Sequence, residues 1–294
     1  MKDTGLITAE YVNTVIKERP TEIHKGQCGR VLIVAGSVGM AGAAVLAARG
    51  ALKSGAGLVK IAAPYEIFDI LQTAVPQATC IDVSEGFDQG FLDIYGAIAV
   101  GPGLGVDERT YLLIRDILKH YNGTVVLDAD GINCICRYDD KLSSVRERQA
   151  PVILTPHVGE ADRLLAAAEK GDVKSMGRQN AAEVISEYTG ASVLLKGHGT
   201  IVTAVGTGTE DKPVTYINTT GNAGMATGGS GDVLTGVIAA LAANGTDPFE
   251  AAKAGAFMHG LAGDIAAEIH GQWGMTSVEI EEALPAAFKT IVGK

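Results

Sequence analysis

Short apolar runs alternate with helical patterns along nearly the whole chain, and this alternation limits the fold more than any other feature. Val31–Ala35 (VLIVA) and Leu58–Ala62 have the continuous apolar character of strands that are buried on both faces. Between them, Ala41–Ser54 predicts a helix of small residues that ends at Gly55. Repeated succession of strand, loop and helix predicts an α/β fold with a mostly parallel sheet and helices on both faces.

The same pattern continues toward the end of the chain. It predicts further strands at Ala97–Val100, Thr124–Leu127, Val152–Leu154 and Ser192–Leu195, and helices at Asp107–His120 and Glu160–Glu169. Ile201–Ala204 and Val214–Ile217 predict an antiparallel hairpin, and three helical segments are expected from Gly228 onward. No long linker, low-complexity tract or internal repeat interrupts the pattern. We therefore expect one domain over residues 1–294.

Glycines and polar residues gather where the predicted strands end. These segments are Gly36-Ser37, Gly101–Gly105 (GPGLG), Asp128–Asp130 (DAD), Thr155–His157 and Lys196–Thr200 (KGHGT). In open α/β sheets, ligands bind beyond the carboxyl ends of the strands. We therefore expect these five segments to line one site.

Composition excludes several classes of function. The chain has 24 basic and 34 acidic residues, a net charge of −10, which disfavours binding to nucleic acid or to an anionic membrane. The first residues lack the apolar core of a signal peptide, no apolar run approaches the ~18 residues of a membrane span, and the four cysteines form no CxxC pair. These features predict a cytoplasmic protein with reduced thiols. Helices rich in Gly and Ala suit close packing between subunits, so we also expect a homo-oligomer.

The strongest chemical signal lies in Asn218–Gly236 (NTTGNAGMATGGSGDVLTG). Glycines let backbone N–H groups turn toward one point, and the N-terminus of the helix that follows adds positive potential. Gly229, Ser230 and Gly231 therefore predict an anion hole for a phosphate or a developing negative charge. Asp232 follows on the first helical turn, where it would take a proton from a hydroxyl that attacks phosphorus. The alternative is that Asp232 only stabilises the helix and the glycines only permit packing.

Three other motifs are weaker. His157 and Glu160 form an HxxE pattern, in which Glu160 would orient a water on Mg²⁺ beside phosphates, although the helix dipole alone also favours Glu there. Asp128 or Asp130 would support the metal or a ribose. Lys196–Thr200 would wrap the phosphate or ribose of a nucleotide, or would form a plain turn. The Walker, protein-kinase, zincin and hydrolase-elbow patterns are absent from the sequence.

In this order, the segments resemble those of the NAD(P)H-hydrate dehydratases, a family of the ribokinase-like superfamily. They read AGSVGMAGAAVLAARGALKSGAGLV, GPGLG, LDADGIN, LTPHVGEADRL, LLKGHGTIV and NTTGNAGMATGGSGDVLTGVIAAL. The resemblance covers nearly the whole chain from about Ile7, and its most specific part is the run that contains GGSGD. It implies a ribokinase-like three-layer α/β/α sandwich. It also implies the stand-alone form of an enzyme that is often fused to an epimerase domain.

The resemblance implies an activity as well: repair of NADH and NADPH in which water has added across a ring double bond. The S epimer of the hydrate is dehydrated at the expense of a nucleotide, with ADP preferred and ATP possible, and with Mg²⁺ as cofactor. The chemistry is reasonable because hydroxide is a poor leaving group, whereas phosphate is a good one. Once the ring hydroxyl is phosphorylated, the lone pair of the ring nitrogen helps to expel phosphate and the double bond returns.

Individual residues take roles by the same resemblance. Asp232 resembles the base, and Gly229, Ser230 and Gly231 resemble the hole for the transferred phosphoryl group. The residues that resemble the adenine-nucleotide site are Lys196, Gly197, His198, Gly199 and Thr200, with Gly231 also on the nucleotide side. The residues that resemble the hydrate-binding positions are Ala43, Gly103 or Gly105, and His157, with Asp232 shared. Glu160 resembles an acidic residue that holds Mg²⁺ through water.

Other readings remain open at this point. A kinase for a vitamin precursor, such as a thiazole or pyrimidine alcohol, would share the anion hole and the base, and would release a stable phosphorylated product. A nucleotide sensor would bind without turnover, which the presence of Asp232 disfavours. An NAD-dependent dehydrogenase is disfavoured because no GxGxxG follows the first predicted strand.

Overall fold

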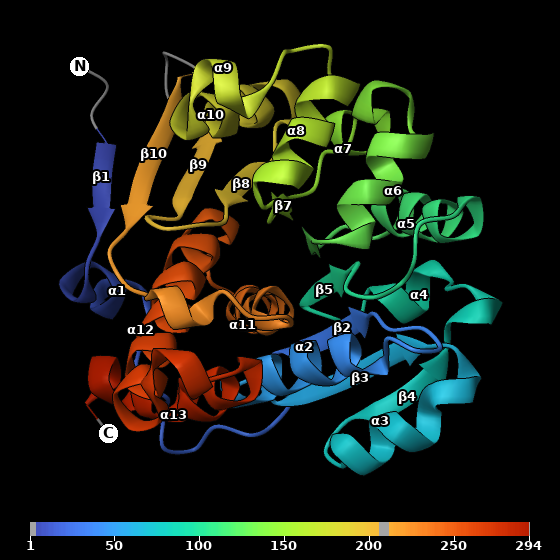
Figure 1. Cartoon of the computed structure of the whole chain (residues 1–294). Coiled ribbons are helices and arrows are strands. Elements are labelled where there is room, and N and C mark those ends of the chain that lie inside the picture. The colour runs from blue at the N-terminus through green and yellow to red at the C-terminus, as the bar shows by residue number, and fades with distance from the viewer. Residues whose placement is uncertain (1–3, 206–211, 294) are drawn as a thin grey trace.

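The computed structural model describes residues 4–205 and 212–293 (Figure 1). The strands are β1 (Thr4–Ile7), β2 (Arg30–Val34), β3 (Leu58–Ala63), β4 (Thr79–Asp82), β5 (Ala97–Val100), β6 (Thr124–Leu127), β7 (Val152–Leu154), β8 (Ser192–Leu195), β9 (Ile201–Val205) and β10 (Pro213–Asn218). The α-helices are α1 (Ala9–Val15), α2 (Ala41–Lys53), α3 (Phe68–Ala74), α4 (Gln89–Leu92), α5 (Glu108–His120), α6 (Asp130–Tyr138), α7 (Ser143–Arg146), α8 (Val158–Ala167), α9 (Val173–Met176), α10 (Arg178–Thr189), α11 (Ser230–Ala243), α12 (Pro248–Gly274) and α13 (Ser277–Val292). Short 3₁₀ turns join some of them: η1 (Tyr65–Ile67), η2 (Val83–Glu85), η3 (Asp140–Leu142) and η4 (Ala223–Met225).

Within these described ranges, ten strands form one sheet in the order β1-β10-β9-β8-β7-β6-β5-β2-β3-β4. Strands β2 to β8 pair in parallel, and β9 runs antiparallel to both β8 and β10. The mostly parallel α/β sheet and the antiparallel hairpin that the sequence predicts are therefore confirmed.

Two edge strands escaped prediction. Thr4–Ile7 pairs in parallel with β10 at one edge, and Thr79–Asp82 pairs in parallel with β3 at the other. Only Ile7 among their residues is fully buried. Edge strands have a partner on one side only and are partly exposed, so they lack the continuous apolar run that marked the central strands.

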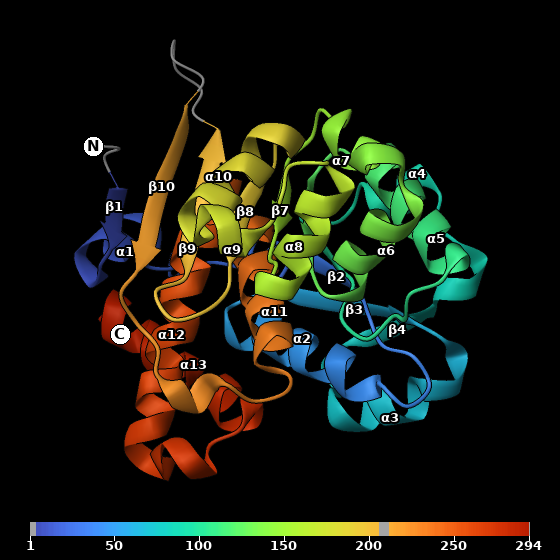
Figure 2. The same ribbon diagram turned by 45° about the horizontal axis from the view of Figure 1, so that its top comes forward.

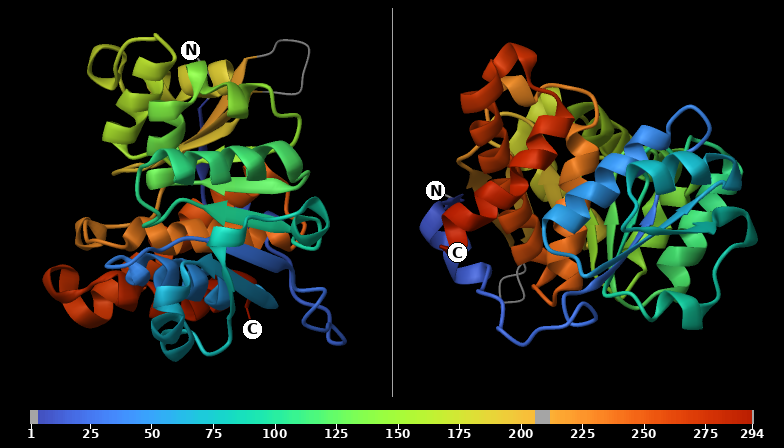
Figure 3. Two further views of the ribbon diagram at one scale, coloured as in Figure 1. Left: turned by 90° about the vertical axis from the view of Figure 1, so that its right-hand side faces the viewer. Right: turned by 90° about the horizontal axis from the view of Figure 1, so that it is seen from below.

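Helices cover both faces of the sheet, which gives the expected three-layer sandwich (Figures 1 and 3). Strand β2 shows how the sequence directs this, because successive side chains of a strand point to opposite faces. Val31 and Ile33 belong to the apolar cluster beneath α2, α11, α12 and α13, whereas Leu32 and Val34 belong to the cluster beneath α5, α6, α8 and α10. Continuous apolar strands are thus required because both faces are covered.

Helices α2 and α11 pack with their backbones in close contact, and Figure 2 shows them side by side. A Cβ atom placed on Gly50 would lie 2.5 Å from the carbonyl oxygen of Val233, and one on Gly236 would lie 2.0 Å from that of Ala47. The small residues that suggested packing between subunits are therefore used within the chain. Among the described residues, no helix is both long enough and apolar enough to cross a bilayer.

Candidate active site at the carboxyl edge of the sheet

Hydrogen bonds join the loops that follow neighbouring strands, so the special segments do meet at one edge. Gly36 N–H donates to the Pro102 carbonyl at 2.8 Å, and Ser37 Oγ donates to the Gly103 carbonyl at 2.8 Å. On the other side, Lys196 N–H donates to the Pro156 carbonyl at 2.8 Å. A Cβ atom on Gly101 would lie only 1.9 Å from the Asp128 carbonyl oxygen, so glycine there lets the loops after β5 and β6 touch. The convergence predicted from the strand ends is confirmed.

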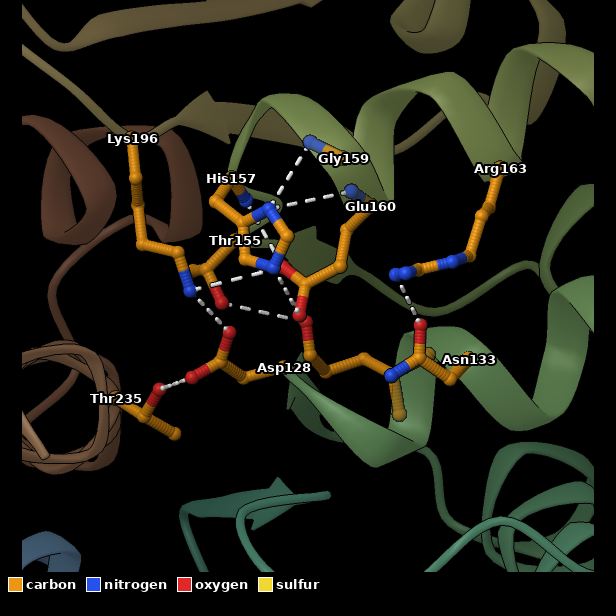
Figure 4. A network of polar contacts seen from close by, with 10 residues as sticks. Asp128, Asn133, Thr155, His157, Gly159, Glu160, Arg163, Lys196 and Thr235 are labelled. Atoms are coloured by element: carbon orange, nitrogen blue, oxygen red, sulfur yellow. Dashed lines mark hydrogen bonds and ion pairs between the residues drawn. The ribbon is translucent and has the colours of Figure 1, made fainter. Parts of the chain in front are cut away.

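A buried ion pair occupies the centre of this edge (Figure 4). Lys196 Nζ lies 2.7 Å from Asp128 Oδ1, and the Asp128 side chain is 1% exposed. The second oxygen, Asp128 Oδ2, accepts a hydrogen bond of 2.7 Å from Thr235 Oγ1 on α11. Glu160 Oε2 is 3.8 Å from the same ammonium group. One lysine thus joins Asp128, directly after β6, to Glu160, on the first turn of α8, and Asp128 is also hydrogen-bonded to α11.

His157 and Glu160 form a capping box at the start of α8. His157 Nδ1 accepts from the N–H groups of Gly159 and Glu160, at 3.0 and 3.3 Å, and Glu160 Oε2 accepts from His157 N–H at 2.8 Å. Because the cap satisfies these amides, α8 begins at Val158, two residues before the predicted start. The His157 side chain is 54% exposed, so about half of it can meet a ligand, and its Nε2 lies 3.3 Å from Glu160 Oε1.

The N-terminus of α11 has the geometry predicted for an anion hole. Gly229 adopts a left-handed conformation (φ 86°), and α11 begins at Ser230. No side chain among the described residues caps this helix start. The first N–H groups of an uncapped helix have no intrahelical acceptor and can bind a ligand. Ser230 N–H makes only a long hydrogen bond, of 3.4 Å, to the Thr227 carbonyl before the helix. A Cβ atom on Gly231 would lie 3.3 Å from Lys196 Nζ. The bare glycine therefore lets the ammonium group approach the first turn of the helix.

Asp232 lies on that first turn beside the ion pair. Burial raises its pKa to about 7, repulsion by Asp128, Asp130 and Glu160 adds to the rise, and attraction by Lys196 opposes it. A carboxylate with a pKa near neutrality both takes a proton readily and stays substantially ionised. The position and the pKa of Asp232 therefore suit a general base.

A neutral histidine lies beside the start of α11. His259 on α12 is 7% exposed, and its Nε2 lies 3.4 Å from Ser230 Oγ. Burial, helped by repulsion from Lys196, lowers the pKa of His259 to about 4. The ring is therefore uncharged near neutral pH and supports Ser230 through a hydrogen bond between neutral groups.

Two of the predicted hydrate-binding positions touch each other, Gly103 on the loop after β5 and Ala43 on the first turn of α2. Gly103 has φ 65°, and a Cβ atom on it would lie 2.9 Å from Cβ of Ala43. Gly105 N–H donates to Asp130 Oδ2 at 2.9 Å, which ties the loop after β5 to the start of α6. Asp128 and Asp130 therefore have different partners, and Ala129 between them is held at φ 48°. Such backbone strain in a non-glycine residue is often found at functional sites.

The predicted nucleotide loop after β8 is a tight turn held from outside. Gly197 and Gly199 have φ of 143° and 58°, and Thr200 Oγ1 donates to the Gly197 carbonyl at 2.9 Å. Arg178 donates to the carbonyl groups of Leu195, His198 and Gly199. Because the guanidinium group donates hydrogen bonds to three of its carbonyls, the loop after β8 is held in one conformation.

A second polar tie orders the segment before α11. Asp264 on α12 accepts from Gly221 N–H at 2.9 Å and from Asn222 Nδ2 at 3.0 Å. Asn222 in turn caps η4, where its Oδ1 accepts from Gly224 N–H at 2.9 Å. The Gly-rich segment is therefore anchored to a long helix rather than left as a free loop.

Four residues of this site were missed by sequence reasoning: Arg178, Thr235, His259 and Asp264. Thr235 carried a usable signal, because it lies four residues after Gly231 and therefore on the same helix face. The other three approach from elements distant in sequence, and no local pattern marks them.

The comparison with known proteins identifies the family. A sequence model described as NAD(P)H-hydrate dehydratase matches residues 31–286. The chain belongs to the NAD(P)H-hydrate dehydratase family. It is 39% identical, over 279 residues, to an ADP-dependent (S)-NAD(P)H-hydrate dehydratase of Neisseria meningitidis, with 90% of this chain and 86% of that protein covered.

Other dehydratase relatives are longer than this chain. It is 38% identical to a bifunctional NAD(P)H-hydrate repair enzyme of Thermofilum pendens, with 93% of this chain but 52% of that protein covered. The chain spans about half the length of several such curated relatives, at 52%, 54%, 54% and 53%. Among solved structures, the ADP/ATP-dependent NAD(P)H-hydrate dehydratase of Bacillus subtilis, co-crystallised with ATP and Mg²⁺, superposes with a TM-score of 0.82 at 29% identity. That match covers 98% of this chain and 99% of the other, and the ribokinase-like fold is thereby shown.

Proposed function

We propose that this protein dehydrates the S epimer of hydrated NADH and NADPH at the expense of an adenine nucleotide, ADP in preference to ATP. The observation that carries the proposal is the carboxyl group of Asp232, which has a pKa of about 7 and lies on the first turn of an uncapped helix. This is the arrangement that phosphoryl transfer to a hydroxyl group requires. The similar dehydratase of Neisseria meningitidis is ADP-dependent, and that of Bacillus subtilis is ADP/ATP-dependent.

The proposed reaction has two stages. Asp232 takes the proton of the ring hydroxyl, its oxygen forms a bond to phosphorus, and the nucleotide leaves with the electron pair of the broken P–O bond. In the second stage the C–O bond of the phosphate ester breaks and inorganic phosphate leaves with the bonding pair, expelled by the lone pair of the ring nitrogen. The neighbouring ring carbon then gives up a proton to water, which restores the double bond. The amides of Gly229, Ser230 and Gly231 stabilise charge on the phosphoryl group. The hydrate would lie against Ala43, Gly103 or Gly105, and His157.

The nucleotide and Mg²⁺ would lie on the β8 side of the site. Lys196, Gly197, His198, Gly199 and Thr200 would bind the nucleotide. Among the described residues, no group of three or more His, Cys, Asp or Glu side chains could enclose a metal ion. Mg²⁺ at nucleotide sites is held largely by phosphates and water. Glu160 is the residue that would contact the ion through water, since its carboxylate lies at this edge of the sheet, 3.8 Å from Lys196 Nζ. When bound, Mg²⁺ would neutralise phosphate charge.

A direct assay tests this proposal. Purified protein would be mixed with NADH hydrate and Mg²⁺, with ADP and ATP in parallel, and absorbance of the reduced nicotinamide ring would be followed. We expect a nucleotide-dependent rise with release of inorganic phosphate, faster with ADP. Asp232→Asn should abolish the rise while the protein still binds ADP. No rise with either nucleotide, from folded protein that binds ADP, would rule the activity out.

A vitamin-precursor kinase is the second candidate. The observation that favours it is the fold, since the chain superposes on a hydroxyethylthiazole kinase of Pyrococcus horikoshii with a TM-score of 0.61 at 15% identity. That level of identity supports the fold alone. A stable phosphorylated product in place of free phosphate would favour the kinase.

We further propose that the chain acts as one domain and works in the cytoplasm as a homo-oligomer. The single sheet running through the described residues supports one domain. Ile269 and Trp273, on either side of the break in α12 at Gly271 (φ 70°), are 71% and 104% exposed, and a second copy would cover them. Light scattering on purified protein measures the oligomer: a monomeric mass would refute it.

A further inference from the structure

The side chain of Lys196 points away from its own loop and toward the anion hole. Its backbone belongs to the turn after β8, but Nζ lies beside the first turn of α11, 3.3 Å from where a Cβ atom of Gly231 would be. The side chain is 20% exposed, so part of it can meet a ligand. A lysine that served only the nucleotide loop would not need to reach across to another helix.

Asp128 and Thr235 fix that position from behind. Both carboxylate oxygens of Asp128 accept hydrogen bonds of 2.7 Å, one from Lys196 Nζ and one from Thr235 Oγ1. Asp128 is 1% exposed and Thr235 is 0% exposed. The strained turn at Ala129 (φ 48°) follows directly. Buried, fully bonded groups such as these have little freedom to reorient. The pair therefore holds the ammonium group at a fixed place relative to the α11 amides.

The positive charge of Lys196 lies among several acidic groups, beside the proposed site of phosphoryl transfer. Asp128, Asp130 and Glu160 each repel the Asp232 carboxylate, and Lys196 is the cation that attracts it. An incoming phosphoryl group would meet the amides of α11 on one side and the ammonium group on the other. A cation placed where negative charge develops stabilises the transition state more than the ground state.

We infer that Lys196 is a catalytic residue that contacts the transferring phosphoryl group, and that Asp128 and Thr235 are positioning residues that hold it there. The inference rests on the proposed function. As the bond from the ring oxygen to phosphorus forms and the bond to the nucleotide breaks, the ammonium group donates hydrogen bonds to the phosphoryl oxygens. It gives up no proton in the step, since Asp232 takes the proton of the hydroxyl group.

The decisive variant is Lys196→Gln, because its amide can still donate to Asp128 while the charge is lost. We expect kcat to fall about 10²–10³-fold, as for loss of a group that stabilises transition-state charge. AMP should bind within threefold of wild type by calorimetry, because residues 197–200 would hold it and Lys196 would meet only the phosphoryl group that AMP lacks. If Lys196 instead serves the nucleotide loop, the Kd for AMP would rise and kcat would stay near wild type, and that result overturns the inference.

Thr235→Val tests the positioning pair without touching the ion pair. We expect kcat to fall about tenfold with the KM for hydrate and nucleotide unchanged, and Thr235→Ser to restore it. Thr203→Val is the matched control, because Thr203 is equally buried and its hydroxyl bonds Thr215, at 3.0 Å, far along the sheet. It should leave kcat unchanged. Equal losses of kcat in Thr235→Val and Thr203→Val, or no rescue by serine, would contradict the positioning role.

Turnover by the wild-type protein distinguishes failure of the proposed function from failure of the role inferred for Lys196. If the wild-type protein does not convert NADH hydrate with ADP or ATP, the proposed function fails and the inference fails with it. If the wild type turns over and Lys196→Gln keeps a kcat within threefold, only the inference fails. Circular dichroism and thermal melts establish that each variant is folded before rates are compared.

Discussion

At the scale of single residues, Asp232 governs how the site responds to pH. Its pKa of about 7 means that half of the protein carries the ionised base near neutrality. We expect kcat/KM for dehydration to fall as pH drops below about 7, approaching tenfold per pH unit. Initial rates between pH 5.5 and 8.5 measure this, with circular dichroism confirming the fold throughout. A flat profile over that range would show that Asp232 is not the base.

The raised pKa of Asp232 also predicts how the free energy of unfolding depends on pH. Its pKa is raised from 3.8, so folding favours the protonated form, and stability from this group is lost as pH rises through about 7. Asp232→Asn should therefore be more stable than wild type at pH 8, by about 1–2 kcal/mol. The advantage should shrink as pH falls toward 4. Denaturant unfolding at pH 8 and pH 5 tests this, and equal stabilities at pH 8 would contradict it.

At the scale of elements, the contact between α2 and α11 holds the anion hole against the sheet. Gly236 is buried, and a side chain there would collide with the Ala47 backbone at 2.0 Å. We expect Gly236→Ala to lower the free energy of unfolding by about 3 kcal/mol, because two backbones must move apart. Gly274→Ala is the matched control, since no atom lies within 4 Å of its Cβ position. It should be neutral or slightly stabilising, and equal losses in both variants would refute the packing argument.

At the scale of the whole molecule, the nucleotide should join parts of the chain that are far apart in sequence. Proposed ligand groups follow β7 and β8 and begin α11, so binding should stabilise the entire fold rather than one loop. With ADP at about 100 times its Kd, we expect about 2.7 kcal/mol of stabilisation and a rise in Tm of about 5 °C or more. Thermal melts with and without ADP and Mg²⁺ measure this, and adenosine serves as the control without phosphates. An unchanged Tm at saturating ADP would contradict nucleotide binding.

Local patterns of the sequence determined the central strands, the carboxyl-edge loops and the placement of Asp232 on a first helical turn. They succeeded because continuous apolar runs, glycine turns and helix starts depend on neighbours a few residues away. Edge strands β1 and β4 fell outside such rules, since partial exposure removes the apolar signal. The small-residue helices showed a limit of another kind. Close packing was predictable from Gly and Ala, but only the fold decided that α2 meets α11 within one chain.

Only the tertiary structure decided how the site is charged and held. Lys196 and Asp128 are 68 residues apart in sequence, and Thr235 and Asp128 are 107 apart, yet they form one buried network. The near-neutral pKa of Asp232 and the depressed pKa of His259 arise from burial and from charges on other elements. Electrostatic interactions depend on distance and burial in space, which no local pattern records. The sequence therefore supplied the reactive groups, and the fold set their protonation and their partners.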